Sequence, residues 1–281
     1  MKRKGLKIAV VVFWLCMMAW LVRFEAFPER FTHSLEGYKS LFSRDILLVD
    51  SWMKIMFKGV PVGYTHTSMD SSEATALVHC TINNRTDLKV RFMGEPQVCT
   101  MNAAVGLDAA YRLQNFSCSL GGGGYSANVS GERSKGRVFE VKLNLNGNPY
   151  KLALNIPDDA ILYSPMTPMT MKRMKVGQEI SVPTYDPITM KKTEVRMKAI
   201  RQESMMVSGE RCDTTVLSTD YHGRQFLTWI DSTGNVVRQE TPLGWTMEKC
   251  SAQEAFEAFR DSDGGEDVLS TVAGLLMSWQ V

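Results

Sequence analysis

The sequence predicts a mainly β fold: one large curved antiparallel sheet, half-barrel-like, with few helices and an N-terminal transmembrane helix. An uncharged apolar run over residues 8–22 follows a basic N-terminus. Apolar residues then alternate with polar ones in short runs between residues 51 and 240, separated by turn-forming pairs such as Asn146-Gly147. Alternating runs joined by tight turns indicate antiparallel hairpins rather than βαβ units.

The N-terminal segment predicts a membrane anchor. Four basic residues lie within the first seven positions, and Arg23 closes the apolar run. Because basic residues stay on the cytoplasmic side, we expect a single-pass protein of the inner (cytoplasmic) membrane with its globular part in the periplasm. A run of 15 residues also fits a signal peptide. Phe24 stands where a signal peptidase needs a small residue, which favours an uncleaved anchor over a cleaved signal.

Composition narrows the class of protein. The formal net charge is +2, and the five basic residues and one acid of residues 1–27 contribute +4, which leaves −2 for the remainder. A globular part of that charge is not a nucleic-acid-binding surface. Five cysteines lie outside the anchor, an odd number, so at least one thiol is unpaired or intermolecular. Their wide spacing matches no metal-binding knuckle.

Four segments are expected in order. Residues 1–27 form the basic tip and the membrane anchor or signal, and 28–50 form a stalk helix and lead-in, because apolar residues recur at helical spacing between 31 and 42. Residues 51–260 form the antiparallel β-domain. Residues 261–281 form a polar linker and an amphipathic terminal helix.

Within the β-domain the alternation places each strand. Strands are expected near 52–57, 60–69, 75–82, 87–93, 97–103, 108–118, 125–131, 139–145 and 150–154. After a stretch at 156–177 that three prolines interrupt, they resume near 178–183, 192–201, 205–218, 225–231 and 235–240. Ser251 begins a short helix through Arg260, and Glu254 completes a capping box.

Several short motifs lie along this domain. They are Trp52-Met53-x-x-Met56-x-x-Gly59-x-x-x-Gly63-Tyr64, Tyr185-Asp186-Pro187, Val207-x-Gly209, Thr228-Trp229-Ile230-Asp231-x-x-Gly234-x-Val236-x-x-x-Glu240 and the helix start at Ser251. Together they resemble the β-rich domain that precedes transglutaminase-like cores in bacterial envelope proteins. The resemblance implies a half-barrel similar to lipoprotein-localisation proteins, which hold acyl chains on a concave face. The sequence departs from that family because no transglutaminase core follows the β-domain.

Candidate chemistry is sparse. Cys212 with His222 offers a thiol and a base, but Cys212 lies in a strand-like run rather than at a helix N-terminus, where a thiolate is stabilised. The sequence therefore predicts no catalytic residues and no cofactor. Thioethers suit Cu(I), so one methionine cluster is a weak copper candidate; its residues are Met166, Met169, Met171 and Met174. An adaptable apolar rim is the alternative role for these side chains.

The terminal helix carries one continuous apolar stripe made of Val268, Leu269, Val272, Leu275, Leu276 and Trp279. A helix of roughly 14 residues is too short to span a bilayer, and alone in water it would be marginal. The stripe must therefore be buried against something. A lid on the chain's own sheet and a docking element for a partner are the two candidates.

These observations predict a non-enzymatic, membrane-anchored extracytoplasmic β-domain that binds a lipid-like or peptide ligand on a concave face. Trp52, Tyr64 and Trp229 are the candidate ligand-binding residues, since each belongs to a hairpin with apolar alternation. The alternative is an accessory module that docks a transglutaminase-like or transporter partner. The expected partners are the membrane, through the N-terminal helix, and a lipid-like ligand or an envelope protein, with no nucleic acid.

Overall fold

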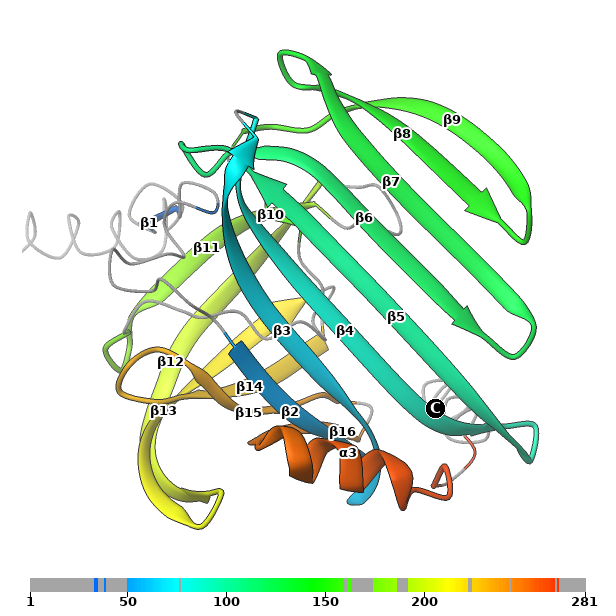
Figure 1. Ribbon diagram of the computed structural model, residues 1–281. Helices are drawn as coiled ribbons and strands as arrows, with labels where there is room; N and C mark the ends of the chain where they lie inside the picture. Colours follow the sequence, from blue (N-terminus) through cyan, green and yellow to red (C-terminus); the bar gives the residue numbers. More distant parts are fainter. Residues whose placement is uncertain are drawn as a thin grey trace, which may run out of the picture.

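The computed structural model describes residues 33–34, 38, 50–75, 77–158, 161–162, 174–185, 192–221, 224–242, 244–265 and 267. These residues form one 16-stranded sheet and one helix (Figure 1). That helix is too short to cross a membrane, and the described residues contain no other candidate span. The predicted anchor over residues 1–27 lies outside the described residues.

The first strands are β1 (His33–Ser34), β2 (Asp50–Phe57), β3 (Val60–Thr75), β4 (Val78–Phe92), β5 (Glu95–Leu107), β6 (Leu113–Gly122), β7 (Tyr125–Lys135), β8 (Val138–Leu145) and β9 (Asn148–Asn155). They are followed by β10 (Ile161–Leu162), β11 (Glu179–Tyr185), β12 (Lys192–Val207), β13 (Glu210–Tyr221), β14 (Arg224–Ile230), β15 (Val236–Glu240) and β16 (Trp245–Cys250). Helix α3 spans Ala252–Arg260.

Neighbouring strands pair in the order β1-β11-β12-β13-β14-β15-β16-β2-β3-β4-β5-β6-β7-β8-β9. All pairs are antiparallel except those of β1 and β10, which both run parallel to β11. Among the described strands the sheet is not closed, because β9 at one end does not pair with β11 or its neighbours at the other. The prediction of a mainly β chain with one large antiparallel sheet is confirmed.

The turn predicted at Asn146-Gly147 forms, and a second two-residue turn at Lys58-Gly59 joins the strands expected at 52–57 and 60–69. Lys58 and Gly59 have φ of 49° and 82°, and Asn146 and Gly147 have φ of 49° and 87°. Two-residue turns with positive φ at both positions match the right-handed twist of the strands that they join. They set the β2–β3 and β8–β9 hairpins in register.

Several strand boundaries differ from the prediction. The run expected at 108–118 becomes a strand only from Leu113, and the run expected at 205–218 is divided between β12 and β13 by a turn at Ser208-Gly209. The runs at 75–82 and 87–93 form one continuous strand, β4, because the polar residues between them are satisfied across the sheet: Asn84 Nδ2 donates to Thr65 and Thr67 hydroxyls at 2.9 Å. The sequence pattern did not indicate β16. His33 and Ser34, assigned above to the stalk helix, instead pair with β11.

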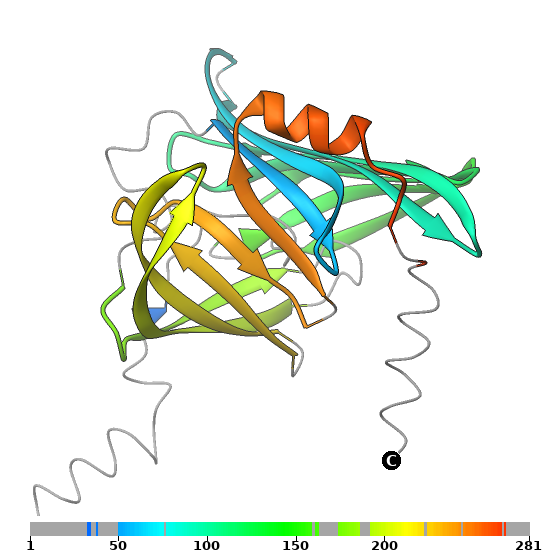
Figure 2. The same cartoon turned by 90° about the horizontal axis from the view of Figure 1, so that it is seen from below.

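The two faces of the sheet can be distinguished along β2, where successive side chains point to opposite sides. Met53, Ile55 and Phe57 point to the inner face and are buried, while Trp52 and Lys54 point to the outer face. Helix α3 packs on the outer face of β2–β4, and β12–β15 lie on the opposite side (Figure 2). The core therefore lies between the two halves of the sheet. Besides strand residues it includes Tyr38, Ile156 and Met174.

Candidate functional site

Two of the three predicted ligand-binding residues, Trp52 and Tyr64, lie together on the outer face beneath α3. The Trp52 ring stacks on His66 with ring centroids 3.9 Å apart and planes at 13°. Its centroid is 5.7 Å from that of Tyr64. Phe256 and Phe259 of α3 contact Tyr64 edge-on, at 5.2 and 5.8 Å. Both predicted residues thus help to attach α3 to the sheet.

A buried carboxylate organises the polar side of this cluster. Asp87 accepts hydrogen bonds from the Tyr64 hydroxyl at 2.6 Å, Arg85 Nε at 2.8 Å and the Thr100 hydroxyl at 2.7 Å. Burial alone would raise the pKa of Asp87, but these three donors hold it below its usual value. Burial, followed by the bond to Asp87, raises the pKa of Tyr64 to about 12. The tyrosine is therefore a fixed donor at neutral pH, not a base.

Trp229, the third predicted residue, belongs to a separate outer-face cluster with Val216 and Val237. Its indole N–H donates to Glu203. The Arg238 guanidinium lies over its ring at 5.5 Å from the centroid. The structure therefore brings Trp52 and Tyr64 together but does not bring Trp229 to them.

The residues considered for chemistry lie apart. Cys212 lies within β13, and burial raises the pKa of its thiol, whereas His222 is outside the described residues. Met174 is buried in the core, and the other three methionines of the copper candidate are outside the described residues. Within the described ranges, no three His, Cys, Asp or Glu side chains gather as a metal site would require.

Away from the core, the inner face of β4–β9 carries large apolar side chains that stay exposed in the described part of the chain. Phe92 is 46% exposed, Leu120 50%, Leu145 42% and Tyr150 54%. Register places Leu120 in line with Leu145 through β7, and Leu143 opposite Tyr150. We name this surface, made of Phe92, Met101, Leu120, Leu143, Leu145 and Tyr150, the open inner surface.

The last described residue lies at the edge of the open inner surface. Asp267 forms a bridge with Arg91, and its carboxylate accepts a 2.6 Å hydrogen bond from the Gly94 N–H. Arg91 and Gly94 flank the tip of the β4–β5 hairpin, next to Phe92. The predicted terminal-helix residues Val268, Leu269, Val272, Leu275, Leu276 and Trp279 lie outside the described residues.

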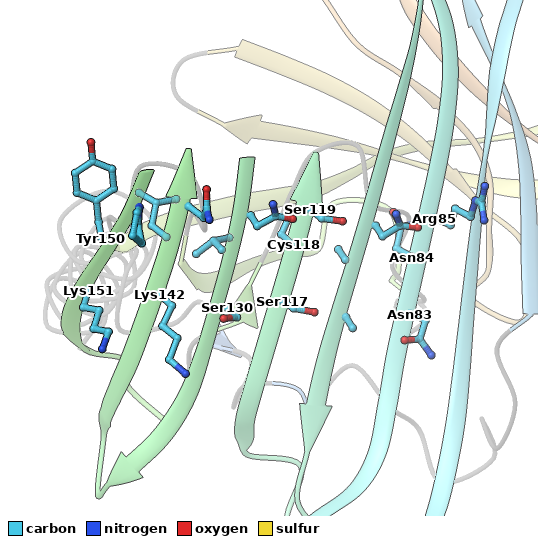
Figure 3. Close-up of a pocket in the computed structure, with 18 of the residues that line it drawn as sticks. Asn83, Asn84, Arg85, Ser117, Cys118, Ser119, Ser130, Lys142, Tyr150 and Lys151 are labelled. Atoms are coloured by element: carbon cyan, nitrogen blue, oxygen red, sulfur yellow. The ribbon is translucent and has the colours of Figure 1, made fainter. Parts of the chain in front are cut away.

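A groove with a volume of about 610 Å³ crosses the sheet from β3 to β9 (Figure 3). From β3 it is lined by His66 and Ser68 but not by Thr67 between them, which places it on the outer face, the face that also carries α3. The outward side chains of the strands that follow include Asn83, Arg85, Asn102, Ser117, Ser119, Asn128, Ser130, Lys142, Asn144 and Lys151.

Sequence reasoning did not single out this outer groove. Its side chains are the polar members of alternating strands, such as Ser130 and Lys142, and that pattern is equally typical of a solvated sheet face. The available signal was local: several consecutive strands place Asn, Ser or Lys at alternate positions with few carboxylates among them. Only the strand register aligns these positions into one groove.

No protein family and no curated protein matches the chain. Among solved structures, it is similar to a β-barrel-like protein of the domain of unknown function DUF1849 from Brucella abortus, with a TM-score of 0.42 and 9% identity, over 73% of this chain and 95% of that chain. A DUF1089 family protein from Pseudomonas aeruginosa gives a TM-score of 0.34 and 12% identity, over 63% and 89% of the two chains. The resemblance to transglutaminase-associated domains stays a prediction.

Proposed function

We propose that this chain is a membrane-tethered, non-enzymatic envelope protein whose half-barrel holds a lipid-like ligand on the extracytoplasmic side. The open inner surface carries the proposal. It continues the face that forms the core elsewhere, yet Leu120, Leu145 and Tyr150 are about half exposed there. Leu120, Leu145 and Tyr150 lie close together by register on the inner face of β6, β8 and β9, and an exposed apolar patch of this kind marks an interaction site.

The energetics favour an occupant for this surface. Burying one large apolar side chain fully is worth roughly 1.5–3 kcal/mol, so covering several half-exposed side chains offers several kcal/mol in total. A surface of leucine, phenylalanine and methionine side chains suits acyl chains, which need apolar contact and no directional hydrogen bonds.

The terminal segment is the natural competitor for the same surface. Asp267 attaches the chain beside Phe92, and the apolar stripe from Val268 to Trp279 follows directly. A tethered segment acts at a high effective concentration. We therefore propose that it covers the surface as a lid when ligand is absent and leaves it when ligand binds.

Docking of an envelope protein is the alternative for the same surface. The free edge of β9 favours it, because no described strand pairs with that edge. An extended segment of a partner could hydrogen-bond there while its side chains contact Leu145 and Tyr150.

Lipid content tests the proposal. The full-length chain, its Leu120→Asp variant and the matched control Ser119→Asp would be purified from membranes in mild detergent, and co-purifying lipids extracted and quantified by mass spectrometry. Both substitutions add one charge on β6, but they face opposite sides of the sheet. Wild type and Ser119→Asp should retain an apolar species that Leu120→Asp loses, at equal thermal stability. Equal lipid content in all three proteins would contradict a ligand on the inner surface. The same three proteins would also be cross-linked in membranes before purification, and a cross-linked partner protein that Leu120→Asp alone loses would favour docking.

A further inference from the structure

The lining of the outer groove has a one-sided charge. It includes Arg85, Lys142 and Lys151, and none of the described residues that line it is an aspartate or glutamate. His66 also lines it, but its Nε2 atom lies 2.7 Å from the carboxylate of Asp50, next to the groove. The rest of its side chains are mainly amides and hydroxyls. The formal net charge outside residues 1–27 is −2. An excess of basic side chains in this groove therefore does not follow from the overall composition.

Two of these cations face each other directly. Lys142 on β8 pairs with Lys151 on β9 in the antiparallel register, so both ammonium groups leave the same face of adjacent strands. Neither lysine forms an ion pair with another residue that the structure describes. Like charges directly opposite each other across strands are destabilising. An anion bound between them would remove that repulsion.

The nearby acids of the same face do not neutralise this pair. Glu140 lies two residues before Lys142 on β8 and points to the same face. It accepts a 3.0 Å hydrogen bond from the Ser134 hydroxyl and lies opposite Glu132. It therefore borders the groove instead of lining it. At the far end, Asp87 is buried and engaged by three donors, while the Arg85 side chain that it contacts is 60% exposed.

The positions of the cations set the size of the ligand. Arg85 lies on β4 and Lys151 on β9, which are five strand spacings apart, or roughly 24 Å along the sheet. A single phosphate or carboxylate cannot contact both ends. Between them the groove presents Asn102, Ser119 and Asn128, whose amides and hydroxyls donate to and accept from hydroxyl groups.

We propose that the outer groove binds an acidic oligosaccharide: an extended, hydroxyl-rich chain with carboxylate or sulfate groups, one of which lies between Lys142 and Lys151. Single-stranded nucleic acid is the less suitable polyanion. It needs aromatic platforms on which bases stack, and His66 is the only aromatic side chain among the described outward-facing residues of the groove. This site lies on the opposite face from the open inner surface and does not depend on the function proposed above.

Polymer binding tests the proposal on the full-length chain in detergent micelles. The probes are fluorescein-labelled oligogalacturonate, dextran sulfate, neutral dextran and a single-stranded oligothymidylate of similar length, followed by fluorescence anisotropy. Oligogalacturonate or dextran sulfate should bind, neutral dextran should not, and affinity should fall as salt rises. Whether oligogalacturonate or dextran sulfate binds more tightly shows whether the site prefers carboxylate or sulfate groups.

Variants then locate the site. Lys142→Gln/Lys151→Gln should weaken binding of the acidic polymer by at least about tenfold, while Glu140→Gln should strengthen it. Lys175→Gln/Lys198→Gln, which removes two charges from exposed lysines elsewhere, should leave affinity unchanged. Thermal melting confirms that each variant is folded. Equal affinity in the two double variants, no binding of either acidic polymer, or tighter lysine-dependent binding of oligothymidylate would each overturn the proposal.

Discussion

The Tyr64 hydroxyl donates a 2.6 Å hydrogen bond to Asp87 from a ring that α3 covers. We predict that Tyr64→Phe keeps the aromatic packing but lowers the free energy of unfolding by about 1.5–3 kcal/mol, the usual range for a hydrogen bond to a charged group. Urea denaturation measures the change. Tyr125→Phe is the matched control, because Tyr125 is 73% exposed and should show almost no effect. An equal loss in both variants would contradict this role for Asp87.

Acid should weaken the fold through the same carboxylate. Hydrogen bonds from Tyr64, Arg85 and Thr100 keep the pKa of Asp87 below its usual value despite burial. A lowered folded-state pKa stabilises the protein fully above the unfolded pKa of about 3.9, and this stabilisation is lost as pH falls through the folded pKa. Melting temperature should therefore drop below about pH 4. Asp87→Asn should be less stable than wild type at pH 7 and converge with it in acid; parallel curves would refute the linkage.

Trp229 should matter for stability rather than for binding. The side chain is 5% exposed, packs on Val216 and Val237, and donates to Glu203. Trp229→Ala should cost roughly 3–5 kcal/mol. Trp229→Phe, which keeps the ring but removes the N–H, should cost clearly less. Chemical denaturation distinguishes them, and a wild-type melting temperature for Trp229→Ala would show that the cluster contributes nothing.

Gly63 is predicted to be irreplaceable where β3 passes close to β4. A Cβ atom at this position would lie 2.1 Å from the Asp87 carbonyl oxygen, a backbone atom that cannot rotate away. Gly63→Ala should therefore destabilise the protein by about 1–3 kcal/mol. At Gly121 a Cβ atom would meet nothing within 4 Å, so Gly121→Ala serves as the control. Similar stability of the two variants would show that β3 shifts to make room.

Removal of residues 268–281 tests the proposed lid. The truncated chain should expose the open inner surface and bind more of a hydrophobic dye than the full chain does, because Leu120 and Leu145 lose their cover. Leu275→Ser/Leu276→Ser should reproduce the effect, and Ser270→Ala/Ser278→Ala should not. Unchanged dye fluorescence after truncation would exclude a lid and leave docking as the role of the segment.

Local patterns were sufficient for most single elements. Alternation and positive-φ turn pairs located β2, β3, β8 and β9, and the capping box at Ser251 correctly marked the start of α3. They failed where long-range pairing decides the outcome. Asn84 and Thr86 interrupt the apolar pattern of β4, yet they lie buried because Thr65 on β3 supplies their hydrogen bonds.

Side-chain alternation and turn chemistry act between residues close along the chain, so they were enough to predict that this protein is built from antiparallel hairpins. They could not predict which surfaces those hairpins form, because that depends on pairing between strands. Register across many strands places Lys142 opposite Lys151 and separates Trp229 from Trp52 and Tyr64. A one-residue shift in pairing would move every one of these side chains to the other face, and no single strand contains the information that fixes that register.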